Sequence, residues 1–412
     1  MAHTLSTSSP VLISVGTRPE IIKMAPVYAE FKRRGLPVAW VHTGQHREMA
    51  DTLYQFFGIE PEHELRLVRR NNSLAHLNAL LLEGLSELYQ TLKPQAVLVH
   101  GDTTSTLASA QAAFYNDVPI GHVEAGLRTF IPREPFPEEK NRELTARLAR
   151  WHFAPTAGAA VNLAREGIQA GAVYTVGNTA VDAALAASAR LDFLLDSGAA
   201  VLPPEIEALR RRMDGPRNAM GTAPPAWTHN PARPVGWRLI TVTAHRRENW
   251  GGGIAQTARA VAALLASHDD LAVVWPVHGN PAVSEAVHQA LGGLVSHYDG
   301  RLTLCAPLDY PALLWCLRRS ELALTDSGGI QEEGAALSTP VLVLRNTTER
   351  PELIEAGAGL LVGTDEAHVV ATVTQLLNDG PALARMRNAV NPFGDGQTSA
   401  RVADVLQHDL GL

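Results

Sequence analysis

The sequence predicts two α/β domains, each built on a doubly wound parallel sheet. Short runs of β-branched and apolar residues alternate with longer segments in which apolar residues recur every three or four positions, and this alternation is typical of βαβ units. The chain has 412 residues, which exceeds the size at which a single hydrophobic core usually stops growing. Two domains are therefore expected.

The first domain is expected to cover residues 1–194. It begins with a strand at Val11–Val15, followed by a helix at Ile21–Arg34, and a second long helical pattern covers Leu74–Leu92. Each apolar run that ends in Gly, Thr, Ser or Asp is taken as a strand followed by a turn. The further strands predicted in this way are Val38–Thr43, Ala96–His100, Ile120–Val123, His152–Ala154 and Val173–Val176.

Residues 195–237 separate the two predicted domains. This stretch is rich in Pro, Ala and Arg, which favours a linker or a surface excursion. Alternation then resumes over residues 238–392, the second expected domain. Its predicted strands are Leu239–Val242, Ala272–Trp275, Leu302–Leu304, Leu322–Leu324, Val341–Leu344 and Gly359–Val362. In the last segment, residues 393–412, Ser399–Leu410 has a helical pattern that could pack back on the first domain.

Composition excludes several classes of protein. Hydrophobic residues make up 46% of the chain and charged residues 19%, as in an ordinary globular protein. The formal net charge of −7 would repel nucleic acid and an anionic membrane. The chain contains only two cysteines, Cys305 and Cys316, and no apolar stretch long enough to span a bilayer. We therefore expect a cytoplasmic protein with no nucleic-acid or membrane partner.

Ligands of parallel sheets bind where the strands end, because the N-termini of the following helices expose N–H groups there. The first such turn, Gly16–Glu20, contains Arg18, and Lys23 follows it. These two cations could clamp a diphosphate, although a solvated basic helix start would look the same. No GxGxxG or P-loop motif is present to support the phosphate site.

Acidic residues lie in three other turns of the first domain. Asp102 and Glu124 stand at the ends of strands, and Glu138 begins a segment that continues to Arg142. Asp102 could instead cap the next helix, and a Glu in a first helical turn is favoured by the helix dipole. If the three carboxylates meet in one place, they suit acid/base catalysis. The histidines lack the spacing of a metal site, so no metal is expected. No organic cofactor is expected either, since the dinucleotide fingerprint is absent.

The second domain has turns suited to an anion. His245 and Arg246 follow a strand and precede a glycine run. Ser327, Gly328 and Gly329 open a helix, where bare N–H groups can meet a phosphate, and Glu333 one turn later could accept hydrogen bonds from ribose hydroxyls. Arg350 follows a further strand, where it could reach a nucleotide or pair locally with Glu349. A purely structural Ser-Gly-Gly turn is the alternative.

Taken together, these stretches resemble the non-hydrolysing UDP-N-acetylglucosamine 2-epimerase family, and they occur in the family's order from Gly16 to Glu352. The stretches are GTRPEIIKMAP, TGQHREM, HGDTTST, HVEAGLRT, PFPEEKNR, VGNTAVDA, TAHRREN, TDSGGIQEEG and LRNTTERPE. The resemblance implies the B-type glycosyltransferase architecture, in which two Rossmann-like domains flank an interdomain cleft. It also implies a homodimer that serves polysaccharide biosynthesis.

The resemblance implies roles for individual residues. Asp102, Glu124, Glu138 and His245 match the family's catalytic positions. The positions expected to contact the substrate are these same residues except Glu138, together with Arg18, Lys23, Arg142, Ser327, Gly328, Gly329, Glu333 and Arg350. Three further residues resemble a second site at which the substrate acts as an allosteric activator: Gln45, Arg246 and His278.

The implied reaction is the reversible conversion of UDP-N-acetylglucosamine into UDP-N-acetylmannosamine, in which UDP is eliminated to give 2-acetamidoglucal and then added back. Four alternatives remain open at this point: an epimerase for a modified UDP-diacetamido sugar, a UDP-sugar glycosyltransferase of the same architecture, a hydrolysing epimerase, and a nucleotide-sugar sensor without activity. Product analysis would separate them.

Overall fold

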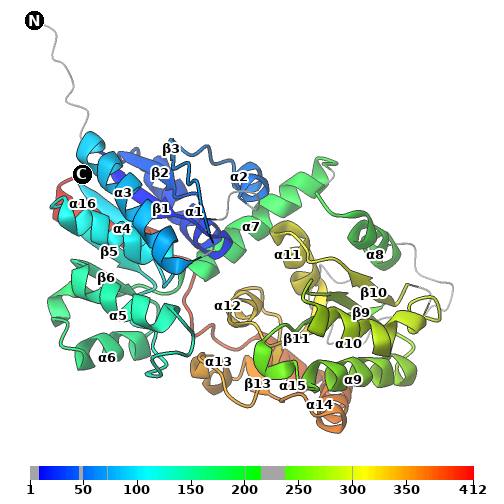
Figure 1. Cartoon of the computed structure of the whole chain (residues 1–412). Coiled ribbons are helices and arrows are strands. Elements are labelled where there is room, and N and C mark those ends of the chain that lie inside the picture. Colours follow the sequence, from blue (N-terminus) through cyan, green and yellow to red (C-terminus); the bar gives the residue numbers. More distant parts are fainter. Residues whose placement is uncertain (1–8, 46–49, 72, 200, 215–236, 299) are drawn as a thin grey trace, which may run out of the picture. The chain divides into compact units, whose positions relative to one another are not determined.

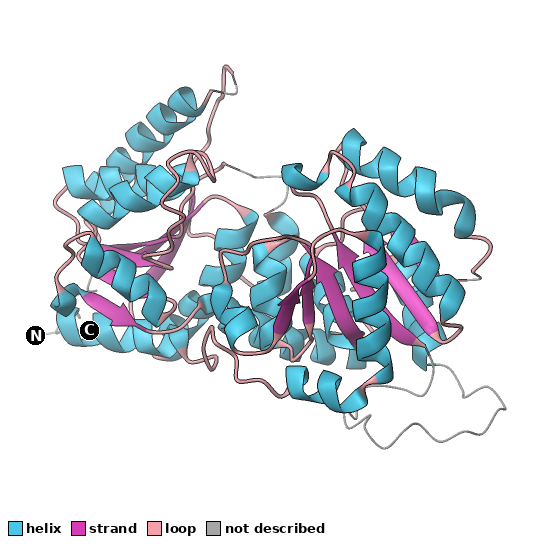
Figure 2. Ribbon diagram, turned by 90° about the horizontal axis from the view of Figure 1, so that it is seen from below, coloured by secondary structure: helices cyan, strands magenta, loops and turns pink. Residues whose placement is uncertain are grey.

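The chain folds into two compact units. The computed structural model describes residues 9–45, 50–71, 73–199, 201–214, 237–298 and 300–412. Unit 1 comprises Met1–Ala186 and Phe393–Leu412, and unit 2 comprises Ala187–Pro392, so the boundary falls inside helix α7. Each unit contains one parallel sheet with helices on both faces (Figures 1 and 2). The prediction of two doubly wound sheets is confirmed.

The sheet of unit 1 has seven strands in the order β3-β2-β1-β4-β5-β6-β7, all paired in parallel. Its strands are β1 Val11–Val15, β2 Val38–His42, β3 His63–Glu64, β4 Ala96–His100, β5 Ile120–Val123, β6 Trp151–Ala154 and β7 Val173–Thr175. Its helices are α1 Arg18–Arg33, α2 Asp51–Phe57, α3 Leu74–Leu92, α4 Thr104–Tyr115, α5 Glu138–Leu148, α6 Ala157–Arg165 and α16 Thr398–Leu410.

The sheet of unit 2 repeats this topology with six strands in the order β10-β9-β8-β11-β12-β13. Its strands are β8 Arg238–Thr243, β9 Leu271–Pro276, β10 Leu302–Cys305, β11 Ser320–Thr325, β12 Val341–Val343 and β13 Gly359–Leu361. The helices are α7 Thr179–Asp196, which crosses the boundary, α8 Pro204–Asp214, α9 Gly253–Ser267, α10 Pro281–Leu291, α11 Tyr310–Arg319, α12 Gly328–Ala336, α13 Pro351–Glu355, α14 Glu366–Asn378 and α15 Gly380–Arg387.

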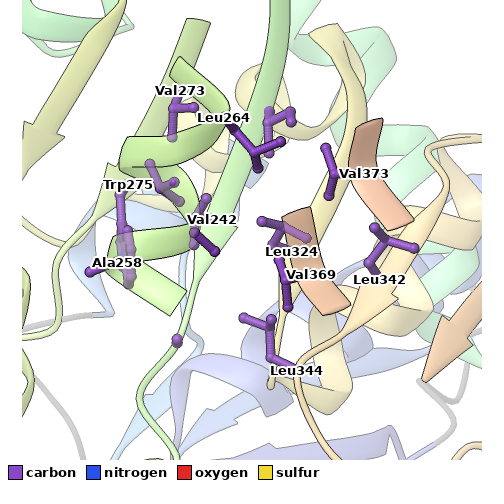
Figure 3. Packing of buried hydrophobic residues seen from close by; sticks show 14 of the residues in the cluster. Val242, Ala258, Leu264, Val273, Trp275, Leu324, Leu342, Leu344, Val369 and Val373 are labelled. Carbon is purple, nitrogen blue, oxygen red and sulfur yellow. The ribbon is translucent and has the colours of Figure 1, made fainter. Parts of the chain in front are cut away.

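The strands are continuous apolar runs because both faces of each sheet are covered by helices. In unit 2, Val242, Leu324 and Leu342 come from the neighbouring strands β8, β11 and β12 and pack with Leu264 of α9 and Val373 of α14 (Figure 3). All five side chains are fully buried. Burial of each such side chain stabilises the fold by roughly 1.5–3 kcal/mol, so the apolar pattern read from the sequence is also the source of the core.

The C-terminal helix α16 belongs to unit 1. Its Asp404 accepts a hydrogen bond from Arg34 at 2.6 Å, and the Trp151 indole N–H donates to Asp409 at 2.7 Å. The buried carboxylate of Asp182 on α7 accepts from the Ser399 N–H at 2.7 Å. The last segment of the chain is thereby attached to α1, β6 and α7.

Two elements escape sequence reasoning. Strand β3 has only two residues, both polar, and it lies at the sheet edge, so it lacks an apolar run. Helix α8, Pro204–Asp214, lies inside the stretch expected to be a linker or surface excursion. It forms because Ile206, Leu209 and Met213 recur at helical spacing and bury against Trp315. The Pro-rich remainder of that stretch, residues 215–236, lies outside the described residues.

In the part of the chain that the structure describes, no helix combines the length and apolar character needed to cross a bilayer.

Candidate active site

Several candidate residues lie at the carboxyl ends of the strands, where the strand order of each sheet reverses. In unit 1 the order reverses between β1 and β4, which pair directly, and in unit 2 it reverses between β8 and β11. Ligands of doubly wound sheets bind at such reversal points, next to the carboxyl ends of the strands. The turns that leave these four strands contain Arg18, Asp102, His245 and Ser327. The topology therefore selects four of the turns that sequence reasoning singled out, and the turns with Glu124 and Arg350 follow the neighbouring strands β5 and β12.

The turn after β1 is tightly packed. A Cβ atom at Gly16 would lie 2.1 Å from Thr43 Oγ1 and 2.3 Å from Ser105 Oγ, so only glycine fits. The carboxylate of Glu20 accepts from the N–H groups of Gly16 at 3.0 Å and of Thr17 at 2.7 Å. Arg18 consequently begins α1 on a rigid turn.

Glu20 also joins this turn to the neighbouring one. Its Oε1 accepts hydrogen bonds from Thr103 Oγ1 at 2.7 Å and from Thr106 Oγ1 at 2.9 Å, at the start of α4. The carboxylate is 1% exposed. Sequence reasoning missed Glu20, although a Thr followed by Glu three residues later is the signature of a capping box.

Asp102 is held from helix α5. Arg142 donates two hydrogen bonds to Asp102 Oδ2, at 2.6 and 3.0 Å, and Asn141 Nδ2 donates to the Asp102 carbonyl at 2.8 Å. The N-cap of α4 is Thr103, whose hydroxyl accepts from the Thr106 N–H. The alternative that Asp102 caps this helix is therefore wrong, and its carboxylate is turned to Arg142 instead.

Glu124 follows β5 in a left-handed backbone conformation, with φ of +64°. Such a conformation strains a residue other than glycine, and strained residues cluster at functional sites. The side chain is 8% exposed, forms an ion pair with Lys23, and lies 3.6 Å from His100 Nε2. Burial alone would raise the pKa of the Glu124 carboxyl, but Lys23 and His100 lower this pKa to well below its ordinary value.

Glu138 is the first residue of α5, and Arg142 lies four residues later on the same helical face. Because Arg142 pairs with Asp102, that face of α5 is directed at the turn after β4. The next residue, Glu139, is fully buried and accepts from the N–H groups of Thr129 at 3.0 Å and Phe130 at 2.8 Å. Glu139 thus organises the preceding loop, and Glu138 precedes Arg142 by one helical turn.

Unit 1 therefore brings Asp102 and Glu124 together at the carboxyl ends of β4 and β5, and Glu138 begins the helix whose Arg142 binds Asp102. A Cβ at Gly101, next to Asp102, would lie 3.8 Å from Glu124 Oε1. Lys23 and Arg142 supply the opposite charge that such a group of carboxylates requires. The arrangement can exchange protons with a bound molecule, which is what acid/base catalysis needs.

In unit 2, His245 lies on the turn after β8. Its ring stacks on that of His278, with centroids 5.5 Å apart and planes inclined by 18°, and the side chain is 40% exposed. Burial lowers the pKa of His245 below its ordinary value, and the nearby His278 and Arg246 lower it further, while Asp326 opposes the change. In the free protein the His245 imidazole is therefore mostly neutral at pH 7.

Ser327 is the N-cap of α12, and Gly328 is its first residue. A Cβ at Gly328 would lie 2.8 Å from Arg350 Cζ, so the guanidinium packs on bare backbone at the helix N-terminus. Buried Glu332 accepts two hydrogen bonds from Arg350, at 2.8 and 2.9 Å, and keeps it there. A helix N-terminus beside an arginine is a suitable place for a phosphate.

Arg350 also makes the local contact considered from the sequence, because its Nη1 lies 3.2 Å from Glu349 Oε2. Arg246 and Arg345 lie 3.8 and 3.5 Å from the same oxygen. Burial would raise the pKa of Glu349, but these three arginines lower it. Glu333, one turn into α12, is partly exposed. Arg350, which follows β12, therefore lies at the start of α12. Glu332 and Glu349 balance part of its positive charge.

The three residues assigned to a second site fall into different units. Gln45 belongs to unit 1, where its Oε1 accepts from Ser105 Oγ at 2.7 Å beside the Gly16 turn. Arg246 and His278 belong to unit 2 and lie next to His245. His46–Met49, which follow Gln45 in its motif, lie outside the described residues. Among the described residues no group of three or more His, Cys, Asp and Glu side chains could hold a metal ion.

The chain matches the model of the UDP-N-acetylglucosamine 2-epimerase family over residues 29–210 and 218–407. It is 40% identical to the UDP-N-acetylglucosamine 2-epimerase of Escherichia coli K12 over 400 residues, covering 97% of this chain and 98% of the relative. It is also 40% identical to the enzyme of Bacillus subtilis strain 168 over 403 residues, covering 97% of this chain and 96% of that relative.

A solved structure agrees with these sequence relatives. The UDP-GlcNAc 2-epimerase of Neisseria meningitidis, crystallised with UDP-GlcNAc bound, superimposes with a TM-score of 0.80 at 36% identity and covers 97% of this chain and 100% of that one. Fold, turn motifs and full-length similarity agree. The chain therefore belongs to the UDP-N-acetylglucosamine 2-epimerase family.

Proposed function

We propose that this protein interconverts UDP-N-acetylglucosamine and UDP-N-acetylmannosamine by inverting the second carbon of the sugar. The observation that supports the proposal most strongly is the pair of carboxylates at the carboxyl ends of β4 and β5, Asp102 and Glu124, which are bound by Arg142 and Lys23. A protein that only binds a nucleotide sugar would have no need of such a pair. The identity of the substrate is inferred from the full-length relatives named above.

The chemistry of the substrate restricts the route. The hydrogen to be inverted lies on a carbon that bears an acetamido group and has no neighbouring carbonyl, so an enolate cannot form. Elimination avoids this difficulty. The bond from the second carbon to hydrogen and the bond from the first carbon to the diphosphate oxygen break, which leaves 2-acetamidoglucal and UDP. A proton then returns to the opposite face of the second carbon while the UDP oxygen adds to the first carbon.

We assign stabilisation of the leaving diphosphate to cations and helix starts. Arg350 and the N-terminus of α12 at Ser327–Gly329 offer positive charge where the charge of UDP develops. His245, which is neutral in the free protein, gains a proton readily when a diphosphate dianion lies beside it. Arg18 and Lys23 supply further positive charge from the start of α1, and Glu333 is assigned to the ribose.

We assign the two proton transfers to Asp102, Glu124 and Glu138. Removal and return take place on opposite faces of the sugar ring, so at least two groups must take part. Glu124 is kept ionised by Lys23 and His100, which suits a group that accepts a proton.

We also propose a cytoplasmic homodimer, in line with the family resemblance, and light scattering of the purified protein tests the dimer.

The decisive experiment follows the hydrogen on the second sugar carbon. The purified protein is incubated with UDP-N-acetylglucosamine in deuterated water, and proton NMR is recorded over time. We expect deuterium at the second carbon of both sugar nucleotides. Asp102→Asn should slow the exchange strongly, whereas Asp404→Asn, which removes an exposed carboxylate of the same unit, should leave it unchanged.

Titration with UDP provides the control for folding and binding. If the protein binds UDP but introduces no deuterium, the elimination route is wrong. Release of free N-acetylmannosamine would indicate a hydrolysing epimerase, and transfer of the sugar to an added acceptor would indicate a glycosyltransferase.

A further inference from the structure

Asp326 is a buried carboxylate directly after β11, one residue before the N-cap of α12, and its side chain is 0% exposed. Its Oδ2 accepts hydrogen bonds from the N–H groups of His245 and Arg246 and from Asn249 Nδ2, each at 2.9 Å. All three donors are uncharged and belong to the turn after β8. The carboxylate therefore connects this turn to the start of α12.

The network extends to a third turn. Asn249 Nδ2 also donates to the carbonyl of Leu344 at 3.2 Å, immediately before Arg345 on the segment that follows β12. The Trp250 indole N–H donates to the His245 carbonyl at 3.0 Å and closes the turn on itself. Asp326 and Asn249 thus join the turns after β8, β11 and β12, which contain His245, Ser327 and Arg350.

Regular secondary structure does not make this connection. The ladder between β8 and β11 ends at Thr243 and Thr325, and the last backbone bond at this end runs from the Asp326 N–H to the Thr243 carbonyl at 3.2 Å. Helix α9 begins only at Gly253. Between these points, the Asp326 side chain supplies the acceptor for two consecutive backbone N–H groups, so the geometry of the His245 turn depends on it.

The charge of Asp326 requires an explanation. Stability alone does not favour a buried carboxylate, because well-packed apolar residues often serve as well. A negative charge next to the start of α12 also opposes the binding of a diphosphate. The carboxylate nevertheless has acceptor capacity for three donors at once and lies 3.5 Å from His245 Nδ1, where it favours a protonated imidazole. Both properties act on the turn that contains His245.

We propose that Asp326 is a positioning residue for the reaction: its carboxylate holds the His245 turn against the N-terminus of α12, so that both contact one diphosphate. The inference rests on the proposed function for the identity of the ligand. Asp326 itself is enclosed by protein and touches no substrate. Sequence reasoning did not single it out, although Asp326 precedes the Ser-Gly-Gly turn.

A matched control lies at the other end of β11. Glu321 near the start of β11 is also a buried acid, 6% exposed, and it pairs with Arg387 at the opposite end of the sheet. Replacing either acid by alanine removes a buried carboxylate at one end of β11. Only the loss of Asp326 should disturb the His245 turn, so the comparison separates positioning from general stability.

The experiment compares Asp326→Ala, Asp326→Asn and Glu321→Ala in the full-length chain at a temperature at which each is folded. Hydrogen exchange of the segment 244–250, read by mass spectrometry, reports the His245 and Arg246 N–H groups, and calorimetry with UDP reports binding. For Asp326→Ala we expect exchange of the segment and the UDP dissociation constant each to rise by roughly tenfold to a hundredfold. Asp326→Asn, which retains one acceptor oxygen, should restore part of both, and Glu321→Ala should change neither.

Turnover supplies a further readout. If Asp326 acts through the His245 turn, Asp326→Ala should lower kcat much less in a His245→Ala background than in the wild type. If Asp326→Ala does not fold, Asn249→Leu removes one donor of the same network, and we expect a smaller loss of UDP affinity with faster exchange of the segment.

Unchanged exchange of the segment 244–250 in a folded Asp326→Ala variant would overturn the proposal, as would an equal loss of UDP affinity in Glu321→Ala. These readouts do not depend on epimerisation. If the wild type binds UDP but introduces no deuterium, the proposed function fails, while the positioning role is still decided by exchange and UDP affinity.

Discussion

Lys23 on α1 is ion-paired with Glu124 at the end of β5, although 101 residues separate them in sequence. The pair links the cation expected at the diphosphate to a carboxylate expected to transfer a proton. Glu124 is buried and its backbone is left-handed. Holding this carboxylate beside Lys23 and His100 therefore costs free energy, both for desolvation of the charge and for backbone strain. The predictions below start from this pair.

Replacing Lys23 by Met should shift the acid limb of the pH profile of kcat to higher pH. Lys23 opposes the effect of burial on the pKa of Glu124, so without Lys23 this pKa rises and the carboxylate becomes protonated at a higher pH. Activity that requires ionised Glu124 is then lost earlier as the pH falls. The control is Lys32→Met, because Lys32 lies on the same helix and pairs with Glu62. If the acid limb of the kcat profile does not shift in a folded Lys23→Met variant, Glu124 is not the base whose ionisation limits activity.

Arg142→Met should lower kcat by roughly tenfold to a hundredfold, because it frees the Asp102 carboxylate from two hydrogen bonds and lets it move away from its working position. Steady-state kinetics at saturating substrate measure this. Arg147→Met provides the matched control on α5, since Arg147 donates to the carbonyl of Glu166 at 2.7 Å. Equal losses in both variants would contradict a specific role for the pair of Arg142 and Asp102.

Gly328→Ala should weaken UDP binding by about tenfold while the protein stays folded. The added Cβ would meet the Arg350 guanidinium at 2.8 Å, and this end of a flexible side chain can move aside. Because the effect acts through Arg350, adding Arg350→Met to Gly328→Ala should cost little more than either change alone. Calorimetry with UDP tests this. Gly251→Ala is the control, since nothing lies within 4 Å of a Cβ at that position, and an additive double variant would refute the mechanism.

The folding stability should fall as the pH drops from 8 to 5 because of two buried histidines. Burial lowers the pKa of His122 to about 3 and that of His152 to about 4. In this range both histidines bind protons in the unfolded chain but stay mostly neutral in the folded chain. The free energy of unfolding therefore decreases as the pH falls through 6.5. Together the two shifts amount to about 4 kcal/mol at pH 5.

Denaturant unfolding at several pH values measures this dependence. His152→Phe should reduce the loss by about half, because one of the two groups no longer titrates. His297→Phe serves as a control, since His297 is exposed. A pH dependence that is the same in wild type and His152→Phe would show that other groups cause it.

Local patterns in the sequence were sufficient for most of the architecture. Ala96–His100 and Leu74–Leu92 are observed with the predicted bounds, because apolar runs and helical periodicity report burial directly. Strand β3 and helix α8 were missed for the opposite reason: the former has no apolar residue, and the latter lies in a Pro- and Arg-rich stretch that suggested a linker. The candidate turns were found because strand ends and helix starts are also local features.

Contacts within the site could not be read in the same way. Whether Asp102 caps α4 or faces Arg142 depends on where α5 lies, and helix α5 begins 36 residues later. The same holds for Glu332, which anchors Arg350, and for Asp326, which accepts from His245 across 81 residues. These partners have no fixed spacing along the chain, so no periodicity points to them.

The amino-acid sequence by itself determined the two doubly wound sheets, the turns that contain the candidate residues, and the family. Only the tertiary structure decided which charges are paired: Lys23 with Glu124, Arg142 with Asp102, and Arg350 with Glu332. The physical reason is that secondary structure follows from interactions between near neighbours, whereas the ionisation and orientation of a buried side chain depend on groups that strand order brings next to it.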